Sequence, residues 1–384
     1  MTFGRDGSDT PPWRVLQLIY SLPVGGAEDL MAAMITGLDA RRFEVQAATI
    51  GPPGVVGQEL LRAGYAVRSL GLDLKRTPFV RLVARLRDLL REVQPDILHT
   101  HLYHPNLYGR LASLGLGLKG VVASVHNSYT RVKVHRCLWN FFLSGITDKV
   151  LVSSPQVWQD VHTWDRVPAG KLEVFPYGIR LTDLEVSPAP ATIRAELGIS
   201  GFVLGVVGRL EEQKGHRYLL EALPEIIPEI PDLTVLLVGE GKEGAALRNL
   251  VQELGLGSRV HFLGTRRDLP RLFLAMDLFV QPSLWEGLPL TLLMAMGAGL
   301  PVVGTRVSGI TDVVEDGRNG MLVAPGDSQA LTQAIIALYQ RPETRRRLGD
   351  AARRTVAEKH SQEAMLRHLE HIYLTILERK KSGR

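Results

Sequence analysis

The sequence alternates short apolar runs with longer amphipathic stretches, and it does so twice. In the first half, five apolar runs are expected to be strands: residues 14–20, 43–50, 96–102, 121–127 and 149–154. In the second half, six runs repeat the scheme: residues 202–208, 234–241, 260–264, 278–283, 301–305 and 320–324. Strands that are apolar along their whole length are typical of parallel sheets covered by helices on both faces. The pattern therefore predicts an α/β protein with two doubly wound, Rossmann-like domains of parallel sheet.

The expected boundaries follow from changes in this pattern. We expect a disordered tail over residues 1–12, which lack the apolar core of a signal peptide. The first domain is predicted over 13–181 and the second over 182–358, with a helical segment at 359–384. The proline-containing, less periodic stretch 181–192 is the expected linker between the domains.

Composition limits the cell compartment and the partners. The chain of 384 residues is 45% hydrophobic and 22% charged, as is usual for a globular protein, and charges or glycines interrupt its apolar runs. A single cysteine, Cys137, excludes an intramolecular disulfide and is consistent with a reducing compartment, so we expect a cytoplasmic protein. Residues 1–180 carry an excess of six basic residues. This excess indicates either an anionic partner for the first domain or an incidental surface charge.

Small residues follow the first strand of the first domain. In sheets of this kind, ligands bind beyond the carboxyl ends of the strands, and two such domains are expected to form a site in the cleft between them. Gly25 and Gly26 lie in the loop after the first strand, where a bare backbone can approach a ligand closely. No G-x-G-x-x-G follows any predicted strand, which argues against a nicotinamide enzyme.

Cations follow the strands of the second domain. "VGRLEEQKGH" (207–216) places Arg209 at a strand end and Lys214 five residues later, a pair suited to a diphosphate. The loops after the next two strands contribute Gly241, and then Thr265 and Arg266. We therefore expect a row of strand-end loops that line one groove.

The stretch "PSLWEGLPLTLLMAMGAGLP" (282–301) sets a carboxylate at the start of a predicted helix. The helix-start residues, whose backbone can face an anion or polar oxygens, are Gly287, Leu288, Pro289, Leu290 and Thr291. Glu286 stands just ahead of them and can accept hydrogen bonds from sugar hydroxyls. The alternative role for Glu286 is that of an acid stabilised by the helix dipole.

With these motifs assembled, the chain resembles the retaining glycosyltransferases of family 4, which have the GT-B fold. The resemblance runs from about residue 14 to near the end. It is most specific in "VGRLEEQKG", "FLGTRRDLP", "SLWEGLPLTLLMAMGAGLPVVGT" and "GITDVVEDGRNGMLVAPGD", and includes "GGAE" (25–28) and "SVHN" (124–127).

The resemblance implies transfer of a sugar from a nucleotide-diphosphate donor with retention at the anomeric carbon. It implies that Arg209 and Lys214 neutralise the diphosphate and that Glu286 holds hydroxyls of the donor sugar. Gly25 and Gly26 are then expected to approach the donor phosphates or the acceptor. The resemblance also implies that the last helix, about 360–380, crosses back onto the first domain.

His126 is expected beside the donor sugar by the same resemblance. It is a candidate either for a general base or for a group that positions the sugar by hydrogen bonding. A structural histidine at a strand end is the third reading. The spacing of His99, His101 and His104 suggests a metal cluster, but without a clear fourth ligand a packed or acceptor-side role is favoured.

We expect no cofactor and no metal. The leaving diphosphate needs stabilisation, and no two aspartates stand two positions apart to hold a metal ion for it. Arg209, Lys214 and the helix-start amides offer the alternative. Glu286 has no convincing carboxylate partner for glycoside hydrolysis.

The chain departs from the family pattern at two positions. The family has two glutamates separated by seven residues; Glu286 supplies the first, and Met294 occupies the second. By resemblance, that second acid holds the ribose hydroxyls, and its loss is expected to weaken donor binding about tenfold to a hundredfold. Arg180 stands where an acidic residue is common.

The expected acceptor is a glycan or a lipid-linked molecule, in the synthesis of a surface polysaccharide or a glycolipid. Residues 75–93 and 130–145 combine cations with apolar and aromatic side chains, which suits peripheral contact with an anionic membrane. The alternative is that both are amphipathic helices packed on the sheet. We expect no nucleic-acid binding, because no recognition module is present.

Two other functions are compatible with the same fold. A nucleotide-sugar epimerase requires acid and base groups at the donor sugar and no acceptor groove. A catalytically silent protein that binds a nucleotide sugar is suggested by Met294. Product analysis with and without acceptor separates the epimerase, and a donor-hydrolysis assay separates the silent protein.

Overall fold

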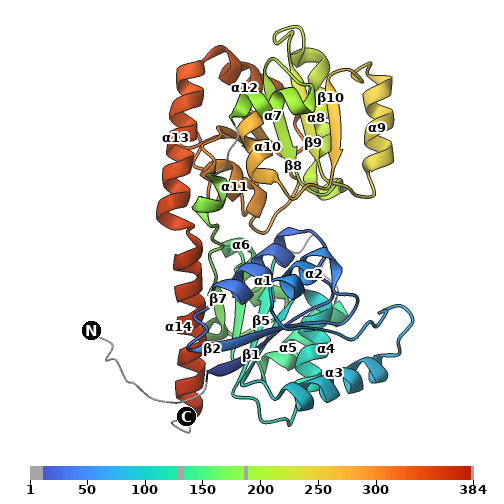
Figure 1. Ribbon diagram of the computed structural model, residues 1–384, viewed down its shortest axis with the longest axis vertical. Coiled ribbons are helices and arrows are strands. Elements are labelled where there is room, and N and C mark those ends of the chain that lie inside the picture. The colour runs from blue at the N-terminus through green and yellow to red at the C-terminus, as the bar shows by residue number, and fades with distance from the viewer. Residues whose placement is uncertain (1–11, 128–133, 186–188, 382–384) are drawn as a thin grey trace.

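The computed structural model describes residues 12–127, 134–185 and 189–381, which form two parallel-sheet domains stacked along the long axis of the molecule (Figure 1). The prediction of two doubly wound α/β domains is confirmed. All eleven strands expected from the apolar runs are present. Two edge strands that the sequence did not reveal, β3 (Val67–Ser69) and β7 (Leu172–Val174), complete the first sheet.

The first domain contains a seven-stranded sheet with the order β3-β2-β1-β4-β5-β6-β7, and its neighbouring strands are parallel. The remaining strands are β1 (Trp13–Ile19), β2 (Phe43–Thr49), β4 (Ile97–His101), β5 (Gly120–Val125) and β6 (Lys149–Val152). The helices are α1 (Gly26–Gly37), α2 (Gly54–Arg62), α3 (Phe79–Val93), α4 (Tyr103–Ser113), α5 (Val134–Ser144), α6 (Pro155–Trp164) and the 3-10 turn η1 (Ala169–Lys171). The strand order reverses between β1 and β4, so the loops after these strands diverge and leave a crevice.

The second domain repeats the design with the order β10-β9-β8-β11-β12-β13, again all parallel. Its strands are β8 (Val203–Val207), β9 (Thr234–Val238), β10 (Val260–Gly264), β11 (Leu278–Gln281), β12 (Val302–Thr305) and β13 (Met321–Val323). Its helices are α7 (Pro190–Leu197), α8 (His216–Ile226), α9 (Gly244–Glu253), α10 (Leu269–Ala275), α11 (Leu290–Gly297), α12 (Ser328–Gln340) and α13 (Pro342–Lys359), with the 3-10 turn η3 (Glu212–Lys214). Here the order reverses between β8 and β11.

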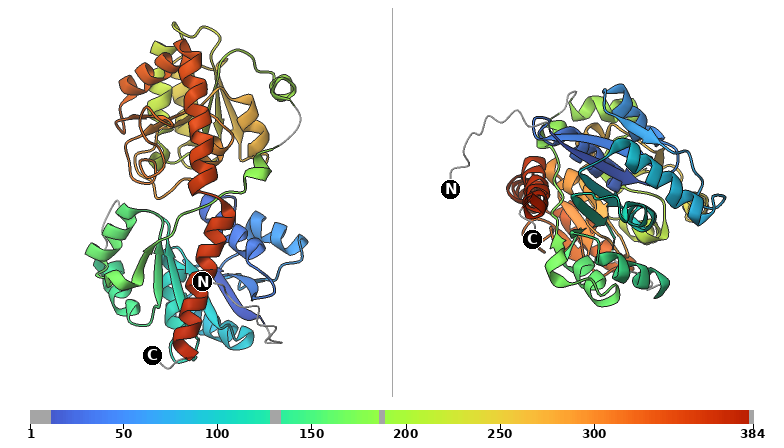
Figure 2. Two further views of the ribbon diagram at one scale, coloured as in Figure 1. Left: turned by 90° about the vertical axis from the view of Figure 1, so that its left-hand side faces the viewer. Right: turned by 90° about the horizontal axis from the view of Figure 1, so that it is seen from below.

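Two chain segments cross between the domains side by side. The outgoing segment passes Ile179, whose amide donates to the carbonyl of His360 at 2.9 Å, and the returning Gln362 amide donates to the carbonyl of Ile179 at 3.0 Å. From there α14 (Gln362–Lys381) continues the line of α13 and lies along the first domain (Figures 1 and 2). The chain leaves the first domain and then returns to it in its last helix.

The predicted linker 181–192 is only partly irregular. Leu181–Leu184 forms a 3-10 turn, η2, and α7 begins at Pro190, where proline is well tolerated in the first helical turn. Residues 186–188 of this linker, like residues 1–11 of the expected tail, lie outside the described part of the chain.

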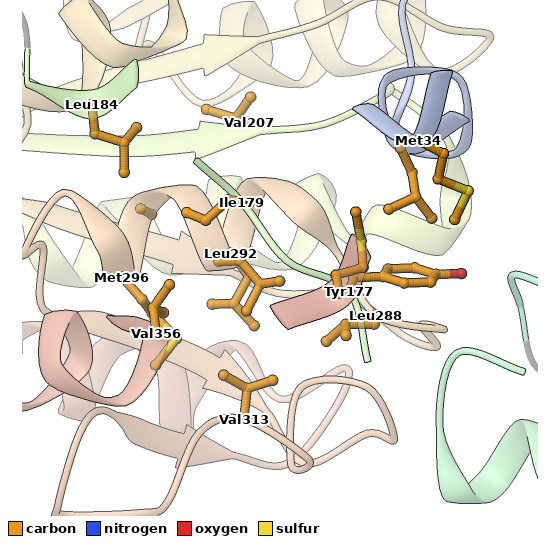
Figure 3. Packing of buried hydrophobic residues seen from close by; sticks show 14 of the residues in the cluster. Met34, Tyr177, Ile179, Leu184, Val207, Leu288, Leu292, Met296, Val313 and Val356 are labelled. Atoms are coloured by element: carbon orange, nitrogen blue, oxygen red, sulfur yellow. The ribbon is translucent and has the colours of Figure 1, made fainter. Parts of the chain in front are cut away.

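Apolar packing continues from one domain into the other around this crossing. Figure 3 shows Tyr177 beside Leu288 of the second domain and Ile179 beside Leu292, with Met34 of α1 above Tyr177. All belong to one buried cluster. The loops at the carboxyl ends of the two sheets meet, since the His126 carbonyl after β5 abuts Gly287 after β11. None of the helices in the described parts of the chain combines the length and the apolar character needed to span a bilayer.

Candidate donor-binding and active site

The reversal of strand order in the second domain brings two cations and one acid to the same place. Arg209 follows β8, Lys214 ends η3, and Glu286 follows β11, which pairs directly with β8. Lys214 and Glu286 are 72 residues apart in the chain, yet Lys214 Nζ donates to Glu286 Oε1 at 2.6 Å. Both side chains are largely buried, with 14% and 4% of their surface exposed. Lys214, which the sequence analysis assigned to the diphosphate, and Glu286, which it assigned to the donor sugar, therefore form one ion pair.

Glu286 is held by neutral donors as well. Its Oε1 also accepts hydrogen bonds from Ser283 Oγ at 2.7 Å and from Gln281 Nε2 at 3.2 Å. Its Oε2 accepts a longer bond, 3.4 Å, from Gln213 Nε2. These donors fix the carboxylate even when Lys214 turns to another partner. Gln281 and Ser283 were not identified from the sequence, although their position at the end of β11 is a usable signal.

The helix start after Glu286 is tightly packed. Pro289 is the N-cap of α11, and the first backbone amides to bond within the helix are those of Leu292 and Leu293, which both donate to the Pro289 carbonyl. Gly287 and Leu288 precede the helix, and Leu290 and Thr291 lie in its first turn, where backbone N–H groups lack partners inside the helix. A Cβ on Gly287 would lie 1.8 Å from the carbonyl oxygen of His126, so only glycine fits where the domains meet.

Arg209 faces the first domain. Its side chain is exposed, and its charge acts on Glu28 in the first turn of α1. Burial raises the pKa of the Glu28 carboxyl above its ordinary value, and Arg209 opposes that rise. Gly25 is the N-cap of α1, and a Cβ on it would lie 2.4 Å from Glu28 Oε2, whereas Gly26 has open space around it. The predicted cation and glycine loops thus belong to the same region between the domains.

The loops after β9 and β10 lie at the same carboxyl edge of the second sheet. Gly241 packs on the carbonyl oxygen of Leu210, which a Cβ would approach to 2.3 Å. Thr265 is exposed, and Arg266 makes two hydrogen bonds to Asp268, at 2.8 and 2.7 Å. The structure therefore places Arg266 against its own helix start.

The next residue, Arg267, links the two domains. It donates to Asp29 Oδ1 of α1 at 2.8 Å and to Glu59 Oε2 of α2 at 2.5 Å. Burial raises the pKa of Asp29, and the hydrogen bond from Arg267 opposes that shift. A second contact between the domains joins the hydroxyls of Ser154 and Ser308 at 3.1 Å. Sequence reasoning missed Arg267, because nothing in "TRRD" says which arginine crosses the cleft.

His126 lies at the meeting point with both ring nitrogens engaged. Its Nδ1 is 2.6 Å from the Tyr177 hydroxyl, and its Nε2 is 3.2 Å from Nδ1 of His101. Burial lowers the pKa of His126 to about 4, so the imidazole is neutral at physiological pH. Its carbonyl oxygen faces Gly287 and also accepts a hydrogen bond from Ser153 Oγ at 3.1 Å. This arrangement orients the residue firmly.

The three histidines whose spacing suggested a metal cluster are hydrogen-bonded or stacked instead. His99 and His101 are fully buried and hydrogen-bonded within the first sheet, and the ring of His104 stacks on Tyr108. Among the residues that the structure describes, no three His, Cys, Asp or Glu side chains gather in a way that holds a metal ion.

Met294 lies in α11 and packs, partly buried, against the apolar cluster that joins the domains. The position at which the family pattern has a second acid is therefore apolar here. Arg180, the second departure, makes a 3.7 Å ion pair with Asp183 at the start of η2.

Two families match the two halves of the chain. Residues 24–183 match the family described as Glycosyltransferase Family 4, and residues 201–341 match the family described as Glycosyl transferases group 1. The chain is 33% identical over 350 residues to the lipopolysaccharide core biosynthesis glycosyltransferase LpsE of Rhizobium meliloti (strain 1021), covering 89% of this chain and 93% of that protein.

Further likeness comes from a second enzyme and from a solved structure. The chain is 31% identical over 296 residues to the UDP-Gal:alpha-D-GlcNAc-diphosphoundecaprenol alpha-1,3-galactosyltransferase of Escherichia coli, covering 71% of this chain and 73% of that one. The crystal structure of Anabaena Alr3699/HepE in complex with UDP-glucose superposes with a TM-score of 0.84 at 23% identity, covering 94% of this chain and 99% of that chain. The fold, the row of strand-end loops and these matches together show that the chain belongs to the group 1 glycosyltransferases of family 4, which have the GT-B fold.

Proposed function

We propose that this glycosyltransferase moves a sugar from a nucleotide-diphosphate sugar to a glycan or lipid-linked acceptor, with retention at the anomeric carbon and without a metal ion. The observation that carries the proposal is the meeting of Arg209, Lys214 and Glu286 at one reversal of strand order. Arg209 and Lys214 bind the diphosphate, and Glu286 binds hydroxyls of the donor sugar. Anabaena Alr3699/HepE was crystallised with UDP and with UDP-glucose, which supports a nucleotide-sugar donor.

The chemistry of the step explains why these groups are needed. Breaking the bond between sugar and diphosphate leaves positive charge on the sugar and negative charge on the diphosphate. Cations and N–H groups that already point at the oxygens of the leaving diphosphate stabilise its negative charge without any rearrangement of the site. Two cations and the first amides of α11 supply this stabilisation here, so no divalent ion is required. With Met294 in place of an acid, the ribose of the donor has no carboxylate contact from α11.

The direct test of this function uses the product. A panel of nucleotide-diphosphate sugars is incubated with the enzyme and a lipid-linked or glycan acceptor in excess EDTA. We expect full activity in EDTA and a product whose anomeric proton shows the configuration of the donor. An inverted product contradicts the retaining step, and activity that returns only with added magnesium contradicts the metal-free step.

The acceptor class follows from the relatives and from a surface of the first domain. The names of two relatives refer to a diphosphoundecaprenol-linked sugar and to the lipopolysaccharide core. Helix α5 buries only Leu143 and Ser144 among its described residues, so its large apolar side chains face outward. We name as the docking face the exposed apolar residues Phe79, Val80, Val134, Leu138, Trp139, Phe141 and Phe142.

The two helices contribute unequally to the docking face. In α3, Leu82, Leu86 and Leu89 are buried on the sheet, so only its first turn, with Phe79 and Val80, joins the face. The rings of Phe79 and Trp139 are 6.5 Å apart, which makes the face continuous from α3 to α5. Exposed cations border it, namely Lys75, Arg76, Arg81 and Arg85. Residues 130–133 of the predicted membrane segment lie outside the described residues. Apolar side chains ringed by cations fit the surface of an anionic bilayer, and we propose that as the occupant.

Two exposed leucines allow a matched test of the docking face. Leu138 of α5 is 52% exposed, and Leu61 of α2, away from the face, is 47% exposed. We expect Leu138→Glu to reduce co-sedimentation with phosphatidylglycerol vesicles at least fivefold, while Leu61→Glu leaves it unchanged. Equal binding by both variants contradicts membrane docking. If Leu138→Glu instead converts a dimer to a monomer, the face binds a second copy of the chain.

A further inference from the structure

A chain of buried hydrogen bonds connects the last helix of the protein to His126. Tyr373 of α14 is fully buried, and its hydroxyl lies 2.9 Å from Gln17 Nε2 and 2.7 Å from His99 Nδ1. His99 Nε2 in turn lies 2.8 Å from the hydroxyl of Ser124. Gln17 and His99 are register partners in β1 and β4, so the helix bonds to the centre of the first sheet.

The chain continues toward the cleft through the same glutamine. Gln17 Oε1 lies 2.5 Å from His101 Nε2, and His101 Nδ1 lies 3.2 Å from His126 Nε2. His126 Nδ1 ends the chain on the hydroxyl of Tyr177. We call this chain the relay; its members are Ser124, His99, Tyr373, Gln17, His101, His126 and Tyr177. The residues of the relay come from six segments, namely β1, β4, β5, α14 and the loops after β5 and β7, which only the folded protein brings together.

Each imidazole ring of the relay has one nitrogen that donates a hydrogen bond and one that accepts. Burial lowers the pKa of His99 to about 3 and that of His126 to about 4, and it holds the pKa of His101 well below its ordinary value. The three imidazoles are therefore neutral near pH 7, and each carries one N–H.

The amide of Gln17 then decides every proton position. With its oxygen toward His101, His101 carries its proton on Nε2 and accepts at Nδ1 from Nε2–H of His126. Gln17 Nε2 donates to Tyr373, whose O–H donates to Nδ1 of His99, so His99 also carries its proton on Nε2. A reversed amide moves all three protons to Nδ1. The relay thus has two self-consistent states, and the three histidines share one tautomer in each.

We propose that Tyr373 and Gln17 are positioning residues that fix the tautomer and the orientation of His126 from the far side of the sheet. His126 carries the carbonyl that abuts Gly287 at the start of α11, so the relay holds the point where the domains meet. The part of this inference that concerns turnover rests on the proposed transferase function. The part that concerns the tautomers does not.

The tautomers are measured without any substrate. The chain has 11 histidines, and selective ¹⁵N-histidine labelling with long-range ¹H–¹⁵N spectra distinguishes Nε2–H from Nδ1–H rings. Substitution of His99, His101 or His126 by glutamine assigns the signals. We expect all three rings to be Nε2–H in the full-length protein. Mixed tautomers among the three overturn the relay.

Two variants cut the relay at the tyrosine and at the amide. Tyr373→Phe keeps the ring against Phe43, 5.8 Å away, and removes only the hydroxyl. Gln17→Met removes the amide at similar volume. In either variant we expect His126 to show both tautomers, and kcat to fall three- to tenfold with donor KM changed less than twofold. The control is Tyr339→Phe, a ring that packs on Phe202 in the second domain.

The possible results of these experiments test the relay and the proposed transferase function separately. If His126 keeps its tautomer and kcat is unchanged in both variants, while Tyr177→Phe alters both, α14 does not position His126 and the inference is wrong. If kcat and KM change together in proportion to a lowered melting temperature, the tyrosine is merely structural. If no donor is turned over by the parent protein, the transferase proposal fails, and the tautomer spectra still decide the relay.

Discussion

Arg209→Ala is expected to lower affinity for a nucleoside diphosphate about 10- to 100-fold and to leave the melting temperature of the free protein unchanged. Arg209 is exposed, and its charge influences the half-buried Glu28 carboxyl less than burial does, so its removal should cost the free protein little stability. A hydrogen bond to a charged group contributes ~1.5–3 kcal/mol, which corresponds to this range of affinity. Because the same charge stabilises the leaving diphosphate, kcat/KM should fall about 10²- to 10³-fold.

The measurement is a thermal-shift titration with nucleoside diphosphates, followed by kinetics with the donor that the panel identifies. A ligand at about 100 times its Kd stabilises the folded state by ~2.7 kcal/mol, so weaker binding appears as a smaller shift at fixed concentration. The matched control is Arg217→Ala. Arg217 is also an exposed arginine near this loop, but it pairs with Glu221 in α8. Equal shifts for parent, Arg209→Ala and Arg217→Ala contradict the diphosphate assignment.

The strands of this protein are readable from sequence because they are buried on both faces. Every run that is apolar without alternation became a parallel strand; those at 202–208 and 234–241 are internal strands, and those at 260–264 and 320–324 are the edges of the second sheet. The missed strands β3 and β7 are three-residue strands at the two edges of the first sheet, where burial is incomplete. Both have a charged residue at their centre, in VRS and LEV, so no apolar run marks them, whereas the equally short edge strand β13 (MLV) is apolar throughout.

The positions of the candidate site residues could be predicted from the sequence, but their side-chain partners could not. Strand-end position identified Arg209, Lys214 and Glu286, because the carboxyl ends of adjacent parallel strands must meet. Position could not predict that Lys214 and Glu286 bond to each other, since sequence reasoning assigned them to different parts of the ligand. Nor could it distinguish Arg266, which turns to Asp268, from Arg267, which crosses to the first domain. Side-chain partners at a domain interface depend on how two separately folded sheets face each other.

Met294 shows a different limit of prediction from the sequence. Its position predicted the loss of an acid, and the structure shows the side chain packed on apolar neighbours. The sequence shows that the acid is missing at this position. The contacts that the methionine makes instead depend on the surrounding fold. The relay from Tyr373 to His126 is the extreme case, because Tyr373 and Gln17 are separated by 356 residues.

The pairing of Lys214 with Glu286 means that the free site is partly self-neutralised. A diphosphate that recruits Lys214 must draw it from the carboxylate, 2.6 Å away. Glu286 then remains oriented by Ser283 and Gln281, which donate to the same oxygen. Donor binding should therefore replace one ion pair by two sets of contacts, cation to diphosphate and carboxylate to sugar. On the proposed assignment of these two residues, the two halves of the donor are coupled through the hydrogen bond between Lys214 and Glu286 in the free protein.

This coupling predicts opposite effects of Glu286→Gln on binding and on turnover. The amide keeps the shape of the side chain and can still accept from Ser283 and Gln281, but it no longer holds Lys214 by charge. Affinity for a nucleoside diphosphate without a sugar should rise about fivefold, a change of ~1 kcal/mol, because Lys214 no longer has to leave a charged partner before it binds the diphosphate. Transfer from the intact donor should fall at least about 100-fold, because the charged acceptor for the sugar hydroxyls is lost.

Calorimetric titration with the nucleoside diphosphate and kinetics with the nucleotide sugar measure the two effects on the same preparation. Lys214→Ala serves as the opposite variant, since it should weaken diphosphate binding and transfer together. Glu225→Gln, an exposed acid on α8, is the control for a lost negative charge. If Glu286→Gln weakens diphosphate binding as much as it weakens transfer, Glu286 holds Lys214 in its binding position instead of competing for it. The ion pair is then a scaffold of the diphosphate site, and the sugar contact must come from another residue.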